Sequence, residues 1–136
     1  MEENKEIMQF LKDNPTFYLA TVEGYLPRVR PIGFAMWYGG HLCLGIGKHK
    51  AAYKQLLDNT NLELCACNDR GEWMRIQGTV DFDNSQAAQT AAFQQMPQLS
   101  DLYNDETGNQ LGIVVIDHLS ARLFSMAGSV REVMSY

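Results

Sequence analysis

The most distinctive chemistry in this sequence is a run of basic side chains between residues 24 and 57 that contains no carboxylate. The run holds five of the chain's 11 Lys and Arg residues and none of its 16 Asp and Glu residues. The whole chain has a formal net charge of -5, so this positive segment lies within an acidic remainder. Such a distribution indicates that either the remainder folds back against the segment or an external anion binds there. The five basic residues are Arg28, Arg30, Lys48, Lys50 and Lys54.

Two of these lysines stand where a helix is expected to begin. Gly47-Lys48-His49-Lys50 leads into an amphipathic stretch, and a helix N-terminus already carries partial positive charge. Lysines at that position are unfavourable by themselves, but they suit an anion bound to the free backbone amides. The alternative is a pair of solvated lysines. The P-loop pattern GxxxxGK[ST] is absent from the sequence. The pattern GxGxxG is also absent, because Gly45 and Gly47 are followed by Lys50 where a third glycine is required.

Arg28 and Arg30 are two residues apart on a predicted strand, so their side chains should project from the same face. Two guanidinium groups on one face can bind a phosphate bidentately. The alternative is a surface pair matched to acidic neighbours. The combination of arginines and lysines on consecutive elements, with no carboxylate between them, favours an anion site.

The segment around these cations reads as strand, hairpin, strand, glycine turn and helix. Gly39 and Gly40 supply the positive φ of a tight hairpin, and Ala52, Tyr53 and Leu56 share one helical face with Leu57. The expected elements are an extended run over 27–37, a turn over 38–41, a strand over 42–46 and a helix over 51–57.

The remaining sequence adds further short strands and helices. Gly78 interrupts a long strand and predicts a bulge, and Asp83-Asn84-Ser85 can cap a helix. About six or seven strands joined mostly by hairpins predict a mainly β, antiparallel, closed or nearly closed barrel with peripheral helices, in one domain spanning 1–136. The expected elements are helices over 4–13 and from 87 to 93, strands over 16–22, 62–67 and 72–82, a loop over 97–109 with a short helix near 99–103, and a hairpin of strands over 111–117 and 121–126.

Composition excludes several classes of protein. Hydrophobic residues make up 46% and charged residues 20%, which is typical of a globular domain. No apolar run approaches a membrane span and the acidic start is unlike a signal peptide, so we expect a cytoplasmic protein. The net acidic charge argues against nucleic-acid binding.

Cys65 and Cys67 share a strand face and are expected to be buried thiols. His41, His49 and His118 lack metal-ligand spacing, so no metal site is expected.

The order of these motifs resembles the pyridoxamine 5′-phosphate oxidase-like family. The resemblance rests on Arg28-Val29-Arg30-Pro31-Ile32, the hairpin, the Gly47-Lys48-His49-Lys50 turn and Trp73-Met74-Arg75-Ile76-Gln77-Gly78, and it covers roughly residues 5 to 126. It implies an FMN-binding split β-barrel that works as a homodimer, with the flavin site at the subunit interface.

The resemblance also implies roles for particular residues. Arg28 and the backbone through Val29, Arg30, Pro31 and Ile32 would line the flavin, with the arginines near its phosphate. The phosphate itself would be held by Gly47, Lys48 and Lys50. The strand that packs at the dimer interface would supply Trp73, Arg75 and Gln77, and Gln77 would reach the flavin of the other subunit.

The expected function is therefore that of an FMN-dependent oxidoreductase acting on an unknown small molecule, with no catalytic residue assigned. The vitamin-forming oxidases are longer and have a C-terminal segment that grips the substrate phosphate, and residues 123–132 do not match it. True pyridoxamine phosphate oxidase activity is therefore not expected. Three alternatives remain: a non-catalytic flavin carrier, a haem-binding barrel with His41, His49 or His118 as axial ligand, and a cofactor-free dimerisation domain.

Overall fold

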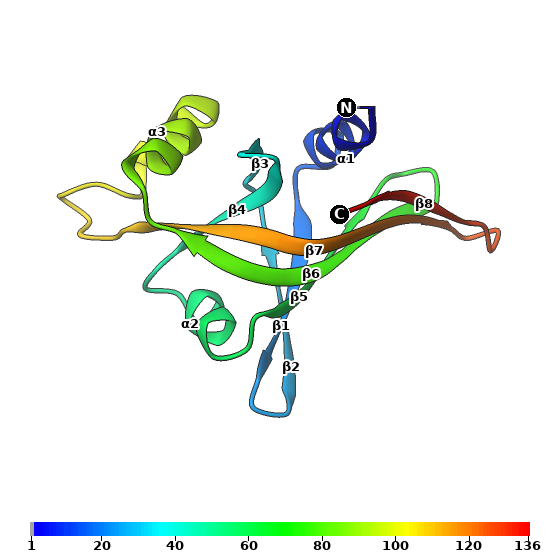
Figure 1. Cartoon of the computed structure of the whole chain (residues 1–136), viewed down its shortest axis with the longest axis horizontal. Coiled ribbons are helices and arrows are strands. Elements are labelled where there is room, and N and C mark those ends of the chain that lie inside the picture. The colour runs from blue at the N-terminus through cyan, green and yellow to red at the C-terminus, as the bar shows by residue number, and fades with distance from the viewer. Residues whose placement is uncertain (1) are drawn as a thin grey trace.

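The computed structural model describes residues 2–136 and consists of an eight-stranded sheet with three α-helices and one short 3₁₀ helix (Figure 1). The long strands β6 and β7 cross the middle of the molecule, and the hairpin of β1 and β2 projects below them. The elements are α1 (Glu2–Asp13), β1 (Phe17–Glu23), β2 (Leu26–Ile32), β3 (Ala35–Tyr38), β4 (His41–Gly47), α2 (Ala51–Asp58), β5 (Asn61–Cys67), β6 (Glu72–Asp83), α3 (Gln86–Gln95), the 3₁₀ helix Pro97–Asp101, β7 (Leu111–Ser125) and β8 (Val130–Ser135).

The sheet closes because its two end strands are consecutive in the chain. The strand order is β2-β1-β5-β6-β7-β4-β3, with β8 paired to β7, and the pairings are antiparallel. Only Gly33 and Phe34 separate β2 from β3. Two residues span at most about 10 Å, so the two ends of the sheet lie next to each other. The result is the expected antiparallel split barrel, split between β2 and β3.

Two groups of buried side chains hold the helices against the sheet. The larger group fills the barrel and receives Ile7 and Leu11 from α1 and Leu56 from α2. The smaller group lies under α3, where Ala88 and Ala92 pack against neighbours that include Phe34 and Ile113. Burial of apolar surface at roughly 25 cal/mol per Å² is the main source of stability for such an arrangement.

Local sequence signals account for several of the turns and caps. Gly39 and Gly40 have φ of 62° and 81°, as the predicted tight hairpin requires. Ser85 caps α3, and its side-chain oxygen accepts a hydrogen bond of 3.2 Å from the Ala88 amide. The bulge predicted at Gly78 is present as a register shift between Gln77 and Thr79.

Two strand predictions were wrong and one strand was missed. The extended run over 27–37 is two strands, because the chain leaves one end of the sheet at Ile32 and joins the other at Ala35. The predicted hairpin over 111–126 is the single strand β7, in which His118 adopts φ of 49° opposite the Gly78 bulge without reversing the chain. Strand β8 was not predicted, and the short helix expected at 99–103 is the 3₁₀ helix over 97–101.

The faces assigned to three side chains were also wrong. Cys65 is half-buried and Cys67 is exposed, because Leu62, Leu64 and Ala66 take the inward positions of β5. On α2, the side chain of Leu57 is 54% exposed, whereas Gln55 is buried. The alternation of β5 identifies two faces without saying which one meets the core, whereas on α2 the predicted face is buried and Leu57 alone lies outside it.

Within residues 2–136, the structure has no helix with the length and hydrophobicity needed to cross a membrane.

The Gly78 bulge provides a test of the barrel packing. A Cβ at this position would lie 2.6 Å from the Asp117 carbonyl oxygen and 2.7 Å from an Ile116 methyl group. We predict that Gly78→Ala lowers the free energy of unfolding by about 1–3 kcal/mol through overpacking, measured by urea denaturation. The matched control is Gly33→Ala, whose Cβ would meet only the Pro15 carbonyl oxygen at 3.6 Å. Equal unfolding midpoints for the two variants would contradict the bulge geometry.

Candidate functional site

The polar centre of the candidate site joins strand β2 to helix α2 through Arg30. One Arg30 nitrogen donates to Thr21 Oγ1 at 2.7 Å and to the Leu19 carbonyl oxygen at 3.2 Å. The other donates to Gln55 Oε1 at 2.6 Å, which also accepts from Thr21 Oγ1 at 2.6 Å. Thr21 and Gln55 are the two buried polar residues of the described chain, and they are each other's partners. Arg30 therefore fixes α2 against the β1–β2 hairpin.

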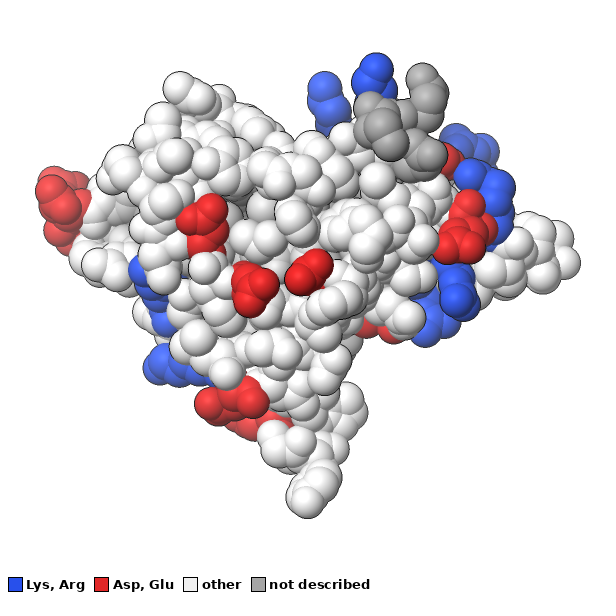
Figure 2. Space-filling view, viewed as in Figure 1, with Lys and Arg blue, Asp and Glu red and all other residues white. Residues whose placement is uncertain are grey.

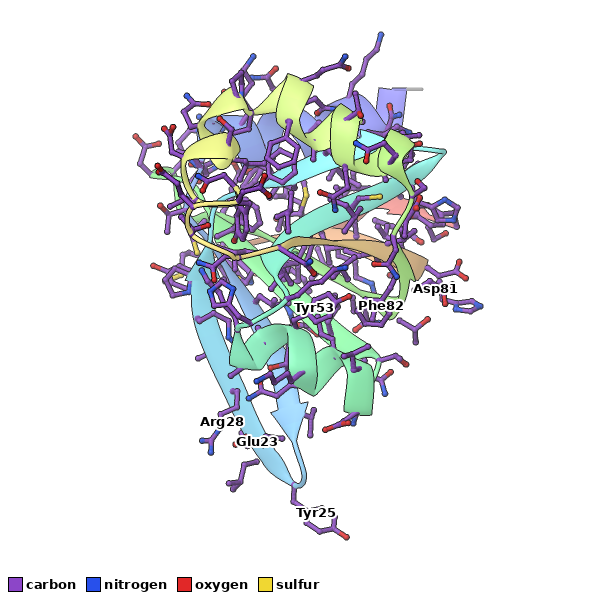
Figure 3. The ribbon with its side chains drawn as sticks, turned by 90° about the vertical axis from the view of Figure 1, so that its left-hand side faces the viewer. Glu23, Tyr25, Arg28, Tyr53, Asp81 and Phe82 are labelled. Carbon is purple, nitrogen blue, oxygen red and sulfur yellow. The ribbon has the colours of Figure 1, made fainter. Side chains whose placement is uncertain are left out.

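Arg28 projects from the same strand face but has a different environment (Figure 3). Its Nε and a terminal nitrogen donate to Glu23 Oε1 at 3.0 and 2.9 Å, and both side chains are about half exposed. An ion pair this exposed contributes about 0–1 kcal/mol, so a stronger anion can compete for the Arg28 guanidinium. Burial, followed by the nearby Arg28 charge, lowers the pKa of Arg30.

Helix α2 is also held from its other side, by Tyr53. The Tyr53 ring meets Phe82 edge-on with centroids 5.2 Å apart (both residues are labelled in Figure 3). The ring also lies over Gly112, where a Cβ would come within 2.3 Å of it. Arg30 and Tyr53 together determine where the N-terminus of α2 lies relative to the strands.

The N-terminus of α2 follows the end of β4 directly. Lys50 is the N-cap residue, with extended backbone angles, and within the described chain its side chain makes no capping hydrogen bond. Residues 51–54 contain no acidic side chain. A helix N-terminus leaves its first amides without helical partners, so this one combines backbone donors with the cations Lys48 and Lys50. Lys50 is exposed and Lys48 is half-buried.

The turn before the helix is crowded around Gly47. A Cβ at Gly47 would lie 2.7 Å from the His49 ring and 3.0 Å from the Tyr103 hydroxyl oxygen. The Lys48 amide donates to the Gln110 carbonyl oxygen at 2.9 Å, which fixes the turn to the segment before β7. Burial raises the pKa of Tyr103. Glycine at this position leaves room for His49 and Tyr103 to fold over the turn.

One cavity lies along α2 and a second lies beside the turn before it, and Lys50 is among the lining residues of neither. One, of about 440 Å³, lies between the β1–β2 hairpin and α2 and is lined by Lys54, Gln55 and Glu23 among others. The second, of about 530 Å³, lies beside α3 and is lined by Lys48, Tyr103 and several Asn and Gln side chains. Lys54 therefore lines the first cavity and Lys48 the second.

The candidate residues of β6 lie on the outer face of the sheet. The Trp73 ring stacks on Phe124 with centroids 5.8 Å apart and an angle of 6°. The Arg75 guanidinium lies 5.2 Å from the Phe124 centroid. It also donates a 2.7 Å hydrogen bond to Glu63, and this bond raises the pKa of Arg75. Gln77 is exposed beside Arg75 and lines a small hollow of about 60 Å³.

The predicted site residues therefore occupy both faces of the sheet. Arg28 and Arg30 face the side covered by α2, whereas Val29 and Pro31 alternate to the outer face, where Val29 is 68% exposed. Residues 73, 75 and 77 share that outer face but are separated from β2 by strands β1 and β5. Within the described chain β2 pairs with β1 alone, so its other edge presents free backbone donors and acceptors.

Sequence reasoning missed the residues that organise this site. Gln55 and Thr21 accept hydrogen bonds from the Arg30 guanidinium. Glu23 forms an ion pair with Arg28, and the Phe124 ring contacts both Trp73 and Arg75. The one available signal was the polar Gln55 between the apolar positions of α2. Its partner Thr21 is far away in the sequence, so local patterns could not connect them.

His41 and His118 each have a ring nitrogen 4.0 Å from the Asp117 carboxylate. His49 belongs to the turn before α2, His118 shares a 2.9 Å hydrogen bond with Thr79, and His41 packs edge-on against Tyr136. None of them lines the cavities beside α2.

Comparison with known proteins identifies relatives over nearly the whole chain. The family model described as pyridoxamine 5′-phosphate oxidase matches residues 4–124. A search of curated proteins found no match.

Several solved structures share the fold. A NimC/NimA family protein from Clostridium acetobutylicum is 30% identical with a TM-score of 0.87, covering 97% of this chain and 92% of that one. A pyridoxamine 5′-phosphate oxidase-related, FMN-binding protein from Nostoc punctiforme is 16% identical with a TM-score of 0.71, covering 98% and 97%. A FAD-binding protein from Mesorhizobium loti is 14% identical with a TM-score of 0.62, covering 89% and 94%.

The Arg30 cluster predicts that two substitutions on α2 change the free energy of unfolding by very different amounts. Gln55→Leu leaves Arg30 and Thr21 without their shared acceptor and should lower the free energy of unfolding by about 1–3 kcal/mol. Leu57→Gln, at an exposed position, should change it by less than about 0.5 kcal/mol. Thermal or urea unfolding measures both. If Leu57→Gln lowers the free energy of unfolding more than Gln55→Leu does, the face of α2 that contains Leu57 meets the core, and the Arg30 cluster is contradicted.

Proposed function

The chain belongs to the pyridoxamine 5′-phosphate oxidase family, and we propose that it binds FMN and acts as an oxidoreductase on a small molecule. Solved structures with this fold include an FMN-binding and a FAD-binding protein, which supports a flavin as the ligand. The observation that carries the proposal is the start of α2, where cations and free helix amides meet without a carboxylate in the first turn.

The residues at this helix start fit a phosphate. The N-cap position is occupied by Lys50, which is unfavourable next to the positive end of the helix unless an anion is present. A phosphate dianion would accept hydrogen bonds from the first amides of α2 and from Lys50, with Lys48 on the adjoining turn. Gly47, which has no Cβ, leaves room on this turn for the His49 ring and the Tyr103 hydroxyl group.

The two arginines have separate roles in this proposal. Arg28 is exposed and weakly paired to Glu23, so it can turn to the phosphate at little cost. Arg30 is committed to Thr21 and Gln55, so it acts as a positioning residue that holds α2 beside β2. The family resemblance alone did not separate these two roles.

The flavin ring would lie along the free edge of β2. The backbone from Arg28 to Ile32 offers unpaired polar groups there, and Val29 and Pro31 present apolar surface on the outer face. When bound, the isoalloxazine of FMN supplies the hydride and electron transfer. The residues of this chain bind it, orient it and exclude water. Consumption of NAD(P)H by the flavin-loaded protein would distinguish an enzyme from a flavin carrier.

A second copy of the chain would complete the site. Trp73, Arg75 and Gln77 lie on the outer face with strands β1 and β5 between them and β2, so one chain does not bring them to the same ligand. The outer face also exposes Tyr18 and Val29. We propose an isologous homodimer that buries this face, with Trp73 between the subunits and Gln77 reaching the flavin held by the partner.

The substitution Lys50→Ala tests the phosphate site directly. It removes a charge-assisted hydrogen bond worth roughly 1.5–3 kcal/mol and should weaken FMN binding about ten- to a hundredfold. Riboflavin, which lacks the phosphate, should bind the variant and the wild type equally. The flavin-free protein should lose no stability, because the substitution removes an unfavourable charge at the helix start. Fluorescence quenching measures both affinities, and melting temperatures measure both forms.

The matched control is Lys54→Ala, one turn further along α2, which should leave FMN affinity unchanged. Loss of FMN affinity in Lys54→Ala with none in Lys50→Ala would place the phosphate in the cavity between the hairpin and α2. Equal binding of FMN by Lys50→Ala and wild type would contradict the proposed site.

A further inference from the structure

We propose that the groove between α1, the β2–β3 connection and the end of α3 binds a small amphiphilic anion, with a hydrocarbon body and a carboxylate or sulfonate headgroup. The groove has a volume of about 670 Å³, within the range of small-molecule sites. Helices α1 and α3 stand on either side of β3 in Figure 1, and the β1–β2 hairpin projects from the opposite end of the molecule. The groove is therefore separate from the Arg28 end of β2.

The floor and sides of the groove are apolar. Leu11, Phe17 and Phe34 line it and are no more than 6% exposed, so they form a fixed floor. Met8 from α1 and Met96 from the end of α3 are half-buried and form the sides. Methionine side chains adapt to ligands of irregular shape, so these walls suit a flexible hydrocarbon chain.

Two lysines of α1 add positive charge to this apolar surface. Lys5 and Lys12 both line the groove and are seven residues apart, which places them two helical turns and about 10 Å apart along one side. The groove-lining residues of the described chain include no carboxylate. Figure 2 shows basic side chains over α1 and an uncharged surface between α1 and α3.

Of two acidic side chains of α1, Glu6 is paired away from the groove with β8, and Asp13 is bonded to the groove-lining residue Gln9. Glu6 accepts hydrogen bonds from Arg131 of β8, and Asp13 accepts a 2.7 Å bond from Gln9. The whole chain is acidic, with net charge -5, so an anion gains no general attraction to this protein. Binding of an anion would depend on Lys5 and Lys12, whose long side chains can bend over the groove toward a headgroup.

Methionine methyl groups provide the readout. Dodecanoate, below its micelle concentration, is titrated into the full chain carrying ¹³C-methyl methionine, with NMR signals assigned from Met8→Leu and Met96→Leu. We expect saturable shifts of Met8 and Met96, while Met126, which is 81% exposed and outside the groove, stays unchanged. The double variant Lys5→Gln/Lys12→Gln should bind dodecanoate at least about tenfold more weakly. Lys54→Gln, an exposed lysine on α2, should bind it as the wild type does.

Three results would overturn this proposal. Binding of dodecan-1-ol as tight as that of dodecanoate, and unaffected by the lysine substitutions, would show apolar association alone. Shifts of Met126 equal to those of Met8 would show non-specific contact with the detergent-like probe. Shifts of Met8 and Met96 that follow protein concentration without any ligand would show that a second copy of the chain fills the groove.

Discussion

The two-residue connection from β2 to β3 is the constraint on which the rest of the structure depends. It joins the ends of a sheet whose other strands lie between them, so the sheet has to curl and close. Closure leaves one edge of β2 unpaired at the split and directs the chain through β3 and β4 to the start of α2. The barrel closure therefore places both the free edge of β2 and the turn into α2 close in sequence to the β2–β4 segment, and Arg30 links β2 to α2.

The cations of the carboxylate-free segment have different environments in the structure. One arginine is used for structure, since Arg30 ties β2 to α2 through Thr21 and Gln55. Arg28 is exposed and paired weakly with Glu23, Lys50 and Lys54 are exposed, and Lys48 is half-buried. Positive charge at the start of α2 is unfavourable in the chain alone and becomes favourable when a dianion binds.

Local signals in the sequence were sufficient for the parts of the fold that depend on neighbouring residues. The Gly39-Gly40 hairpin, the Ser85 cap and the Gly78 bulge each follow from the conformational demands of one or two residues. The continuity of β7 did not follow, because the sequence shows two strand-like stretches separated by residues 118–120, which suggests a hairpin. In the structure the bulge on β6 lies opposite His118, whose φ is 49°, and the strand continues through it. Gln55 was missed because its partners come from two other strands. The residue types of the candidate site were predictable, but their distribution over two faces of the sheet depends on pairing register, which the sequence does not display.

The central claim is that a flavin phosphate binds at the start of α2 and that two chains share the flavin site. Native mass spectrometry of protein reconstituted with FMN at micromolar concentration tests both parts at once. The account predicts a complex of two chains and two FMN molecules, because the residues of the outer face reach the flavin only from a second subunit. A flavin-loaded single chain, or a dimer that takes up no FMN, would contradict it.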